Sequence, residues 1–476
     1  MSTIDNEEGG FRVATTNIQE FVDSNRTKNI DVLIALVKQK SISSSGEGMQ
    51  ETVLKVSELL ESLQAKTQVI QTAGHPIVFG EIKGEQDFTV LLYGHYDVMA
   101  PDPIDAWVSP PFEPSIRDGR LYGRGVGDNK GQLMAQLLGI KAYLEIHKQL
   151  PFHVKFVFEG EEEQGSANLA AFVEEHKDGI LQSDLAISID GSCHESGAPV
   201  LRLGVRGMLY VELEAVSASQ DNHSGNTGNI IKNPAWKLVE LLSQMQGDDG
   251  KVAIKDFYKG VQAPNEQEKA ILNRIPYDSE TLAAKIGLPN LTLSQEEYFT
   301  KLMYEPTLNI SGIHSGYVDA GAKTVIPSKA LLKLDMRLVG KQNPDEIYQN
   351  IENMIEPLEG VSVLKMVSTP PSNTNIDSIF VKPVLAALEQ GFGIKPILEP
   401  VMPGTLPNYV WTDILNVPVL IVPYANFDQA NHAPNENLKL VNFESGIKST
   451  YHIISEISKI IEGGVKANEY VKGNSI

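Results

Sequence analysis

Three short apolar runs constrain the fold, because each stops abruptly where ionisable side chains begin. They lie at Val90–Leu92, Val154–Phe158 and Leu185–Ile189. Short apolar runs of this kind, bounded by turn-forming or acidic residues, are typical of buried strands. In open α/β sheets, the carboxyl ends of the strands carry the ligand-binding residues. The runs therefore predict an α/β sheet with a polar site along one edge.

The side chains that follow these runs are imidazoles and carboxylates. His95 and Asp97 follow the first run, and because residues two apart at a strand end point the same way, we expect them to be neighbours. In that arrangement a carboxylate fixes the tautomer of a metal-binding imidazole. Asp128 precedes a helix that is predicted to begin at Lys130. The second run ends in Glu159, Glu161, Glu162 and Glu163, and the third ends in Asp190.

Length, charge and cysteine content exclude several classes of protein. A chain of 476 residues favours two or three domains. The net charge of −21 argues against nucleic acid or an anionic membrane as a partner. The one cysteine, Cys193, cannot form an intrachain disulfide, which is typical of a reducing compartment. No apolar run approaches the roughly 20 residues that span a bilayer, and the polar start MSTIDNEEGG lacks a signal-peptide pattern. We therefore expect a cytoplasmic protein.

The hydrophobic pattern changes after Gly207. Apolar and polar residues alternate along 209–215 and again along 332–338, which predicts a sheet with one solvated face. Helices are expected to begin at Asn233–Pro234 and Asn343–Pro344, because proline fits the first position of a helix. The elements of this region have the order strand–helix–strand–strand–helix–strand.

This change of pattern divides the chain into two predicted domains. Residues 208–370 form an inserted α+β domain of ferredoxin-like topology, in which 247–303 are helical insertions or loops. Residues 1–207 and 371–476 form a catalytic α/β domain, with a mixed, mostly parallel sheet flanked by helices. The buried strands and helices of the first part resume after the insertion, so one domain interrupts the other.

So many convergent acids would be partly protonated or would need cations between them. Two like charges about 4 Å apart repel by about 4 kcal/mol at an effective dielectric of about 20. With imidazoles delivered to the same place, a divalent metal is the simplest solution: Zn²⁺, or Mn²⁺ or Co²⁺ as the ligand set becomes richer in oxygen. A carboxylate that touches two metals would give the short metal–metal spacing of hydrolytic pairs. A metal pair lowers the pKa of water to about 7, and a neighbouring carboxylate can accept the proton.

Five motifs in fixed order resemble those of the M20 metallopeptidases. They are YGHYDV, GRGVGDNKG, EGEEEQGS, a strand that ends in Asp190, and NHAPNE. The chain is most similar to the branch of cytosolic dipeptidases and carnosinase-like enzymes, over nearly its whole length. The resemblance implies a peptidase that acts on dipeptides or short peptides. It also implies a role for the inserted domain as a lid that forms a homodimer.

The resemblance implies a role for each candidate residue of the metal site. Asp128 bridges two metals, His95 and Asp190 complete one site, and Glu163 and His432 complete the other. Glu162 is the general base, Asp97 orients His95, and the Asp128–Asn129 peptide is cis. The three consecutive acids leave an alternative register in which Glu161 and Glu162 take these two roles. The following Gly165–Ser166 pair favours Glu162 and Glu163.

Three further residues are assigned to the substrate by the same resemblance. His223, in DNHSGNTG, corresponds to a histidine that enters the partner subunit's active site and stabilises the carbonyl oxyanion. Arg337, in LDMRLV, corresponds to the arginine that holds the substrate carboxylate, a task suited to a planar guanidinium. Thr405 occupies the place of a serine in a Gly–Ser turn, which is a departure from the family pattern. His314 repeats the HSG motif and is not assigned beyond a lid loop.

Other interpretations remain open on the sequence alone. Taken singly, His95 would be a satisfied core histidine, Asp190 a helix cap and His432 a surface residue. An N-acyl-amino-acid deacylase, of the desuccinylase or deacetylase type, would use the same fold and chemistry; members of that type often have Glu where this chain has Asp190. A non-catalytic metal-binding protein is the third interpretation, and Glu162 argues against it, because a pure binder needs no proton acceptor beside the metal.

Overall fold

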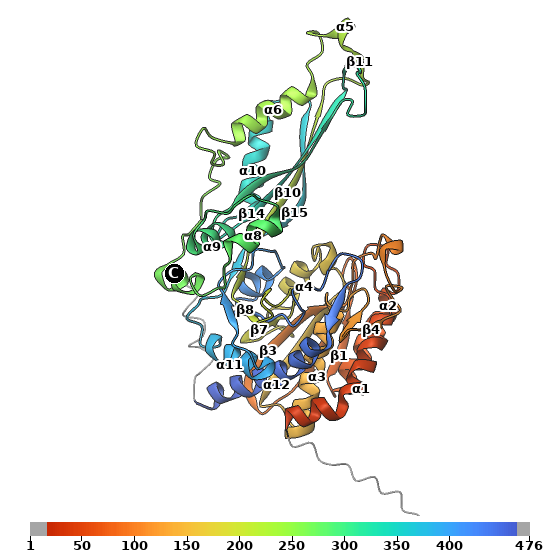
Figure 1. Cartoon of the computed structure of the whole chain (residues 1–476), viewed down its shortest axis with the longest axis vertical. Coiled ribbons are helices and arrows are strands. Elements are labelled where there is room, and N and C mark those ends of the chain that lie inside the picture. The colour runs from red at the N-terminus through yellow and green to blue at the C-terminus, as the bar shows by residue number, and fades with distance from the viewer. Residues whose placement is uncertain (1–16, 464–476) are drawn as a thin grey trace, which may run out of the picture.

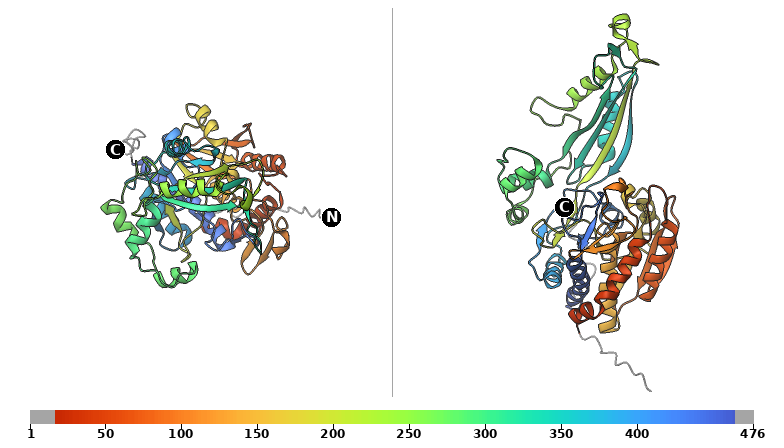
Figure 2. Two further views of the ribbon diagram at one scale, coloured as in Figure 1. Left: turned by 90° about the horizontal axis from the view of Figure 1, so that it is seen from above. Right: turned by 45° about the vertical axis from the view of Figure 1, so that its right-hand side comes forward.

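The computed structural model describes residues 17–463 and shows an elongated molecule in two parts (Figure 1). We call residues 207–369 the arm and the remaining described residues the body. Residues 1–16 and 464–476 of the predicted catalytic domain lie outside the described residues. In Figure 1 and in the right-hand view of Figure 2, where the long axis of the molecule is vertical, the arm lies above the body.

The body is built on a mixed eight-stranded sheet with the order β1-β2-β6-β3-β7-β18-β8-β17. Its strands are β1 (Lys66–Ile70), β2 (Ile77–Ile82), β3 (Gln86–His95), β6 (Phe152–Glu159), β7 (Leu185–Ser188), β8 (Val200–Arg202), β17 (Ile397–Glu399) and β18 (Val419–Ile421). Four neighbouring pairs are parallel, namely β3 with β6, β3 with β7, β18 with β7 and β17 with β8. The predicted mixed, mostly parallel sheet is confirmed.

Both faces of this sheet are buried, which explains why its central strands are apolar without alternation. Val90 and Leu92 of β3 belong to a core shared with helices, and Leu91 and Tyr93 belong to a second core on the opposite face. The first core includes α1 (Ile18–Lys38), α2 (Met49–Ser62), α3 (Lys130–His147), α11 (Val381–Phe392) and α12 (Leu440–Glu462). The second includes α4 (Leu169–His176) and the helical turn Val410–Ile414.

The arm is a four-stranded antiparallel sheet with the order β12-β14-β10-β15. Its strands are β10 (Gly207–Val216), β12 (Thr307–Ser315), β14 (Lys329–Leu338) and β15 (Val361–Thr369). Helices α6 (Pro234–Met245) and α10 (Pro344–Ile355) cover one face, and buried and part-exposed residues alternate along β10 and β14. The order of elements is the strand–helix–strand–strand–helix–strand order predicted from the sequence.

Residues 247–303 contain the helices α7 (Glu266–Leu272), α8 (Ser279–Ile286) and α9 (Gln295–Tyr304). Asn265 and Ser294 start α7 and α9 with capping boxes, in which the cap and the third helical residue exchange hydrogen bonds. Leu272, Phe299 and Met303 pack with Val401 of the body, so this insertion contacts both parts of the molecule.

Short strands complete the structure. They are β4 (Ser115–Arg117), β5 (Arg120–Tyr122) and β19 (Asn437–Lys439) in one sheet, β9 (Gly204–Val205) with β16 (Ser372–Asn373), and β11 (Asn222–His223) with β13 (Val325–Ile326). The helix α5 (Ser224–Thr227) follows β11 at the far end of the arm (Figure 1). Within residues 17–463, none of the helices has the length and apolarity needed to cross a membrane.

Close packing of α3 against α12 holds the helical face of the body together. A methyl group added to Gly139 of α3 would lie 2.4 Å from the Cβ of Thr450 and 2.7 Å from the carbonyl oxygen of Ile447. We expect Gly139→Ala to lower the free energy of unfolding by about 1–2 kcal/mol. Contacts this short, one of them with backbone, place the overpacking cost at about 2–3 kcal/mol, which exceeds the gain of about 1 kcal/mol that alanine brings to a helix.

Urea denaturation checks this prediction, with Gly179→Ala as the matched control. A methyl group on Gly179 would meet no atom closer than 3.7 Å, so the control is expected to stay within about 0.5 kcal/mol of the wild type. A Gly139→Ala protein that is more stable than the wild type would contradict the packing described.

Candidate metal centre

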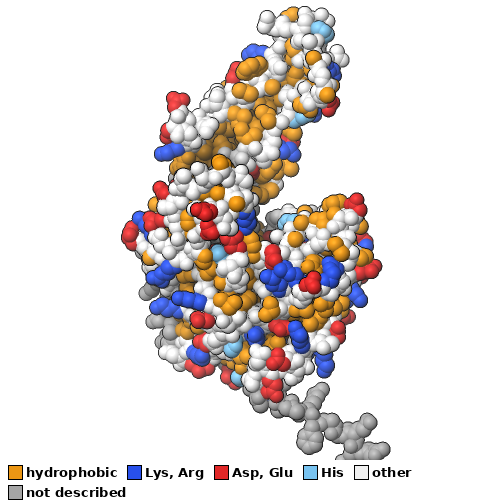
Figure 3. Space-filling view, in the orientation of Figure 1, with side chains coloured by type: hydrophobic (Ala, Val, Ile, Leu, Met, Phe, Trp, Pro, Cys, Tyr) orange, Lys and Arg blue, Asp and Glu red, His pale blue; other side chains and the backbone are white. Residues whose placement is uncertain are grey.

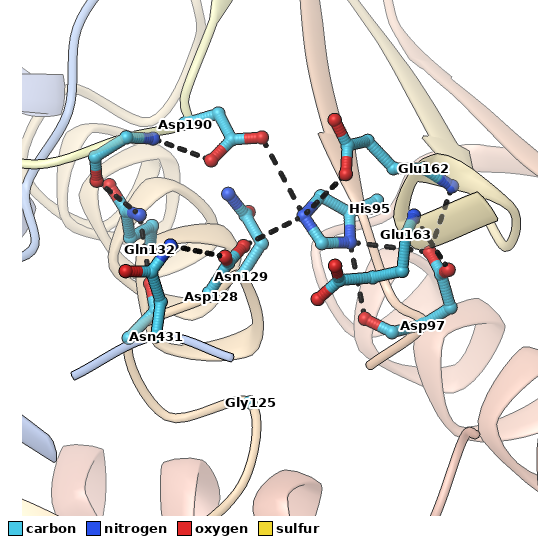
Figure 4. A network of polar contacts seen from close by, with 12 residues as sticks. His95, Asp97, Gly125, Asp128, Asn129, Gln132, Glu162, Glu163, Asp190 and Asn431 are labelled. Carbon is cyan, nitrogen blue, oxygen red and sulfur yellow. Dashed lines mark hydrogen bonds and ion pairs between the residues drawn. The ribbon is translucent and has the colours of Figure 1, made fainter. Parts of the chain in front are cut away.

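Two groups of three ligand-type side chains meet at the carboxyl ends of the central strands. His95, Glu162 and Asp190 form one group, in which one ligand atom from each residue lies within 4.8 Å of the others. Asp128, Glu163 and His432 form the second group by the same measure. His95 ends β3, while the Glu162 and Asp190 segments follow β6 and β7. Figure 4 shows the carboxylates of Asp128, Glu162 and Asp190 directed toward the ring of His95.

Asp128 joins the two groups through its two oxygens. Its Oδ1 lies 3.1 Å from Nε2 of His95, and its Oδ2 lies 3.2 Å from Nε2 of His432. Nε2 of His432 also lies 2.8 Å from Oε2 of Glu163, and Nε2 of His95 lies 3.6 Å from Oδ2 of Asp190. The peptide between Asp128 and Asn129 is cis. One carboxylate is therefore placed between two imidazoles.

Asp97 supports both the imidazole and the acidic turn. Its Oδ1 lies 3.2 Å from Nδ1 of His95, and both side chains are fully buried. When Nδ1 carries the proton and donates to Asp97, the lone pair of Nε2 faces the cluster. The backbone N–H groups of Glu162 and Glu163 also donate to the two oxygens of Asp97, at 3.3 and 3.2 Å. Asp97 therefore fixes the position of the His95 ring relative to the Glu162–Glu163 turn.

Of the three consecutive acids, two face the candidate metal centre and one does not. Glu162 and Glu163 belong to the two groups, whereas the side chain of Glu161 accepts a hydrogen bond from Asn168 at 2.7 Å. The turn closes at Gly165, whose φ of 84° lies in the left-handed region that glycine adopts without strain. The Gly165–Ser166 pair therefore marks the register in which Glu162 and Glu163 face the centre.

Crowding of buried acids and imidazoles perturbs the pKa of every member of the two groups. Burial, followed by the charge of Asp128, raises the pKa of Asp190 to about 7. Burial also raises the pKa of Glu162 and of Glu163. Hydrogen bonds with Asp128 and Glu163 raise the pKa of His432 to about 10. Burial opposes ionisation of Asp128, but its hydrogen bonds with His432 and His95 lower its pKa overall.

Glu436 holds the loop that carries Asp128. Its buried carboxylate accepts hydrogen bonds from the backbone N–H groups of Gly125, Gly127 and Asp128 at 2.8–2.9 Å, and from Nη1 of Arg124 at 2.8 Å. Sequence reasoning quoted Glu436 only as the last letter of NHAPNE. The signal it missed is the glycine-rich loop GRGVGD, whose free N–H groups need a buried acceptor.

Gln132 and Asn129 brace the other side of the centre. Nε2 of Gln132 donates to the carbonyl oxygens of Gly127 and Gly191, at 2.8 and 3.1 Å, and Nδ2 of Asn129 donates to that of Ile189 at 2.7 Å. These amides connect the Asp128 loop to the strand end that carries Asp190. The sequence pattern assigns neither amide a supporting role: Gln132 lies on α3, where a polar residue is ordinarily expected to be exposed, and Asn129 is the N-cap residue of that helix.

The three residues assigned to the substrate are not all near one another. Nη1 of Arg337, on β14, donates to Oγ1 of Thr405 at 2.8 Å, so the structure brings these two together. His223 lies in β11 at the far end of the arm (Figure 1), where Nε2 is 3.2 Å from Oγ1 of Thr324. Within one chain, His223 is therefore remote from His95 and Asp128. His314 is an exposed residue of β12.

The chemistry of the donor set fits a pair of divalent cations. Each group offers one imidazole nitrogen and carboxylate oxygens, which are the donors that Zn²⁺ and similar ions accept in proteins. Burial raises the pKa of Asp190, Glu162 and Glu163, because the described side chains do not fully compensate the negative charge that these acids carry when ionised. An α/β sheet that carries these donors at its strand ends has the arrangement expected of a metal-binding enzyme site.

Comparison with known proteins identifies the family. The chain matches the family described as Peptidase family M20/M25/M40 over residues 91–456, and so belongs to it. It is similar to the human Beta-Ala-His dipeptidase, with 30% identity over 385 residues that cover 78% of this chain and 76% of that protein. It is also similar to the Cys-Gly metallodipeptidase DUG1 of Saccharomyces cerevisiae, with 29% identity over 376 residues that cover 76% and 77% of the two chains.

Solved structures show the same fold. An M20 family metallo-carboxypeptidase from Sulfolobus solfataricus superposes with a TM-score of 0.85 and 33% sequence identity, over 91% of this chain and 99% of that one. The predicted membership of the M20 peptidases, and the prediction of a peptidase, are confirmed.

The pKa values predict that metal uptake releases protons. With a pKa of about 10, His432 is protonated at pH 7 in the metal-free protein, and Asp190, with a pKa of about 7, is partly protonated. Although burial lowers the pKa of His95, its hydrogen bonds with Asp128 and Asp97 raise it overall, so His95 also carries a proton. All three residues must lose their protons to bind a cation, so we expect release of about two or three protons per chain at pH 7. Because the ligands become deprotonated, affinity is expected to rise with pH.

Titration calorimetry with ZnCl₂, in buffers of different ionisation enthalpy, measures the number of protons released. His432→Asn is expected to reduce this number, whereas His314→Asn, which changes an exposed histidine of the arm, is expected to leave it unchanged. A binding enthalpy that is independent of the buffer would contradict the protonated cluster.

Proposed function

We propose that this chain is a binuclear metal-dependent dipeptidase that cleaves the amide bond of dipeptides or short peptides. The observation that carries the proposal is the position of Asp128, whose two oxygens face His95 and His432. A carboxylate in that position can bind two cations at the short separation used by hydrolytic metal pairs, about 3.5–4 Å.

The two groups provide a residue set for each metal. His95 and Asp190 would hold one ion, Glu163 and His432 would hold the other, and Asp128 would be shared. Zn²⁺ fits this set of nitrogen and oxygen donors, and Mn²⁺ or Co²⁺ fit it as well. A bound pair supplies Lewis acidity, which polarises a carbonyl group and lowers the pKa of water.

Glu162 is placed to act as the general base. Its Oε2, in the first group, lies 4.0 Å from Nε2 of His95, and burial raises its pKa well above the ordinary value for glutamate. A base with a raised pKa accepts a proton from water and can return it to the amine that leaves. In this mechanism the Glu162 carboxylate takes one proton from the attacking water and delivers it to the nitrogen of the cleaved bond.

The substrate is proposed to be a peptide with a free carboxylate. The named relatives include dipeptidases and a metallo-carboxypeptidase, whose reactions take place at the ends of short or long peptides. Arg337, hydrogen-bonded to Thr405, would hold that carboxylate, and threonine retains the hydroxyl of the serine found in the family pattern. These relatives favour a dipeptidase over the N-acyl-amino-acid deacylase, and an enzyme over a protein that only binds metal.

The arm, close to the predicted boundary 208–370, is proposed to be a lid and dimerisation domain. Its edge strand β12 has an unpaired side in the described structure, where Ile310 and Ile313 are exposed, and Trp236 and Val239 are exposed on the neighbouring helix α6. Unpaired edge strands with exposed apolar residues favour pairing with another chain. A homodimer formed there could bring His223 to the partner's site, where it would stabilise the oxyanion.

The predicted cytoplasmic location belongs to the same proposal. It is supported by the single cysteine, Cys193, which is buried and free, and whose thiol pKa burial raises to about 12. A thiol held in this neutral form is unreactive.

The role of Glu162 predicts a separation of metal binding from catalysis. We expect Glu162→Gln to retain two equivalents of Zn²⁺ but to lower kcat by about 10²–10⁴-fold, because an amide has the shape of the carboxylate and cannot accept the proton. Metal analysis of the purified protein and steady-state kinetics on Ala-Ala measure the two quantities. Glu161→Gln is the matched control, and it is expected to retain activity. Unchanged turnover in Glu162→Gln would remove the assignment.

The remoteness of His223 predicts complementation between inactive subunits. His223→Ala and Arg337→Ala proteins, each inactive alone, are expected to recover about one quarter of wild-type activity after random mixing. Half of the dimers then contain one of each chain, and one of their two sites has both residues intact. This outcome requires Arg337 to act in its own chain, as its contact with Thr405 indicates, and His223 to act in the partner. No recovery after verified subunit exchange would contradict the shared site.

A further inference from the structure

Arg206 is a buried arginine without an acidic partner. Three arginines are buried in the described chain, namely Arg124, Arg202 and Arg206. Arg124 lies 2.8 Å from Glu436, and Arg202 lies 2.6 Å from Glu399. Among residues 17–463, no Asp or Glu forms an ion pair with Arg206. A buried guanidinium that lacks a carboxylate is costly unless an anion reaches it.

Arg206 and Arg337 lie at the same end of the arm sheet. Arg206 directly precedes β10, whose pairing with β14 starts at Gly207 and Leu338 and continues with Met208 and Arg337. The two guanidinium groups are close enough for the charge of Arg337 to act on Arg206.

Both guanidinium groups contact one turn of the body. Nε of Arg206 donates to the carbonyl oxygen of Pro403 at 2.7 Å, and Nη1 of Arg337 donates to Oγ1 of Thr405 at 2.8 Å. The backbone N–H of Arg206 also donates to the carbonyl oxygens of Met402 and Gly404, at 3.2 and 3.1 Å. These contacts leave the Nη1 and Nη2 groups of Arg206 as additional donors beside Arg337 and Thr405.

Two like charges meet here in a protein of strongly negative net charge. Burial, followed by the positive charge of Arg337, lowers the pKa of Arg206 to about 10. The described residues supply no acid between the two groups, although the chain carries 61 Asp and Glu residues. The pair therefore favours an anion that comes from outside the chain.

The turn that this pair contacts, residues 402–405, adjoins the segment that carries Asp190. The sulfur of Met402 would lie 3.7 Å from a methyl group placed on Gly191. Gly191 directly follows Asp190, a member of the first group. Val401, at the start of the same turn, packs against helices α7 and α9, which fix the turn from the other side. Figure 3 shows the surface hollowed where the arm meets the body.

We propose that Arg206 and Arg337 together bind the α-carboxylate of the substrate's C-terminal residue. The hydroxyl of Thr405, on the body, lies in the turn that both guanidinium groups contact. This inference rests on the proposed function and adds a second guanidinium to the one that the family resemblance implies. Two arginines can bind both oxygens of one carboxylate, which ties recognition to a free C-terminus. The enzyme is thereby an exopeptidase that discriminates against amidated or extended C-termini.

The test uses the Zn²⁺-loaded full-length protein and a pair of non-hydrolysable probes. The probes are the reduced-amide isostere of Ala-Ala, with a CH₂–NH group in place of the peptide bond, ending either in a carboxylate or in a carboxamide. Calorimetry measures the dissociation constant of each. We expect Arg206→Gln to weaken binding of the carboxylate probe by about 10- to 100-fold, the usual size of charge-assisted hydrogen bonds, and to leave the carboxamide probe within about twofold.

Matched variants separate recognition from structure. Arg206→Lys retains the charge without the planar fork and is expected to recover part of the lost affinity for the carboxylate probe. Arg274→Gln makes the same substitution at an exposed arginine of the insertion and is expected to leave both probes unchanged. Kinetics on Ala-Ala should show the effect of Arg206→Gln mainly in KM.

Two outcomes would overturn the inference. Equal weakening of both probes would show that Arg206 only positions the Met402–Thr405 turn, and unchanged affinity for the carboxylate probe would show that it does not reach the ligand. The proposed function fails in a different way, through the absence of Ala-Ala hydrolysis by the wild-type protein loaded with Zn²⁺ or Mn²⁺. Even in that case, the difference in affinity between the carboxylate and carboxamide probes would show whether Arg206 binds the carboxylate.

Discussion

The sharing of one buried carboxylate between two imidazoles is the constraint on which the rest of the structure depends. Asp128 faces His95 on one side and His432 on the other, more than 300 residues later in the chain. Such a cluster can be buried only if its neighbours are fixed, because unpaired charge is costly away from water. Glu436 fixes the backbone of Asp128, and Asp97 fixes both His95 and the Glu162–Glu163 turn. The sheet supplies the rigid strand ends from which these loops extend.

Much of the body and the centre could be predicted because local signals agree with the fold. Short apolar runs mark β3, β6 and β7, and the ionisable residues follow where those strands end. The roles of Glu436 and Gln132 as supports depend on contacts with segments distant in sequence. For Glu436 the glycine-rich loop signals only that a buried acceptor is needed, and not which residue supplies it. The edge strand β12 was also not located, because its residues are mostly exposed and a bulge between Ile310 and Gly312 breaks any alternation.

The arginines proposed to bind the substrate depend on the tertiary structure in the same way. On sequence alone, Arg337 is an ordinary polar residue of an amphipathic strand, and Arg206 carries no signal at all. Their relation appears only when β10 and β14 pair and the turn that ends at Thr405 packs beneath them. The candidate metal centre therefore has a local signature in sequence, whereas the proposed carboxylate site depends on tertiary structure. His223 lies at the opposite end of the arm, away from both.

The central claim is that Asp128 is shared by two divalent cations. Anomalous diffraction from crystals soaked with Zn²⁺, recorded on both sides of the zinc absorption edge, tests it directly. The account predicts two peaks about 3.5–4 Å apart, one beside His95 and Asp190 and the other beside Glu163 and His432, with Asp128 between them. A single peak, or peaks that Asp128 does not contact, would contradict it.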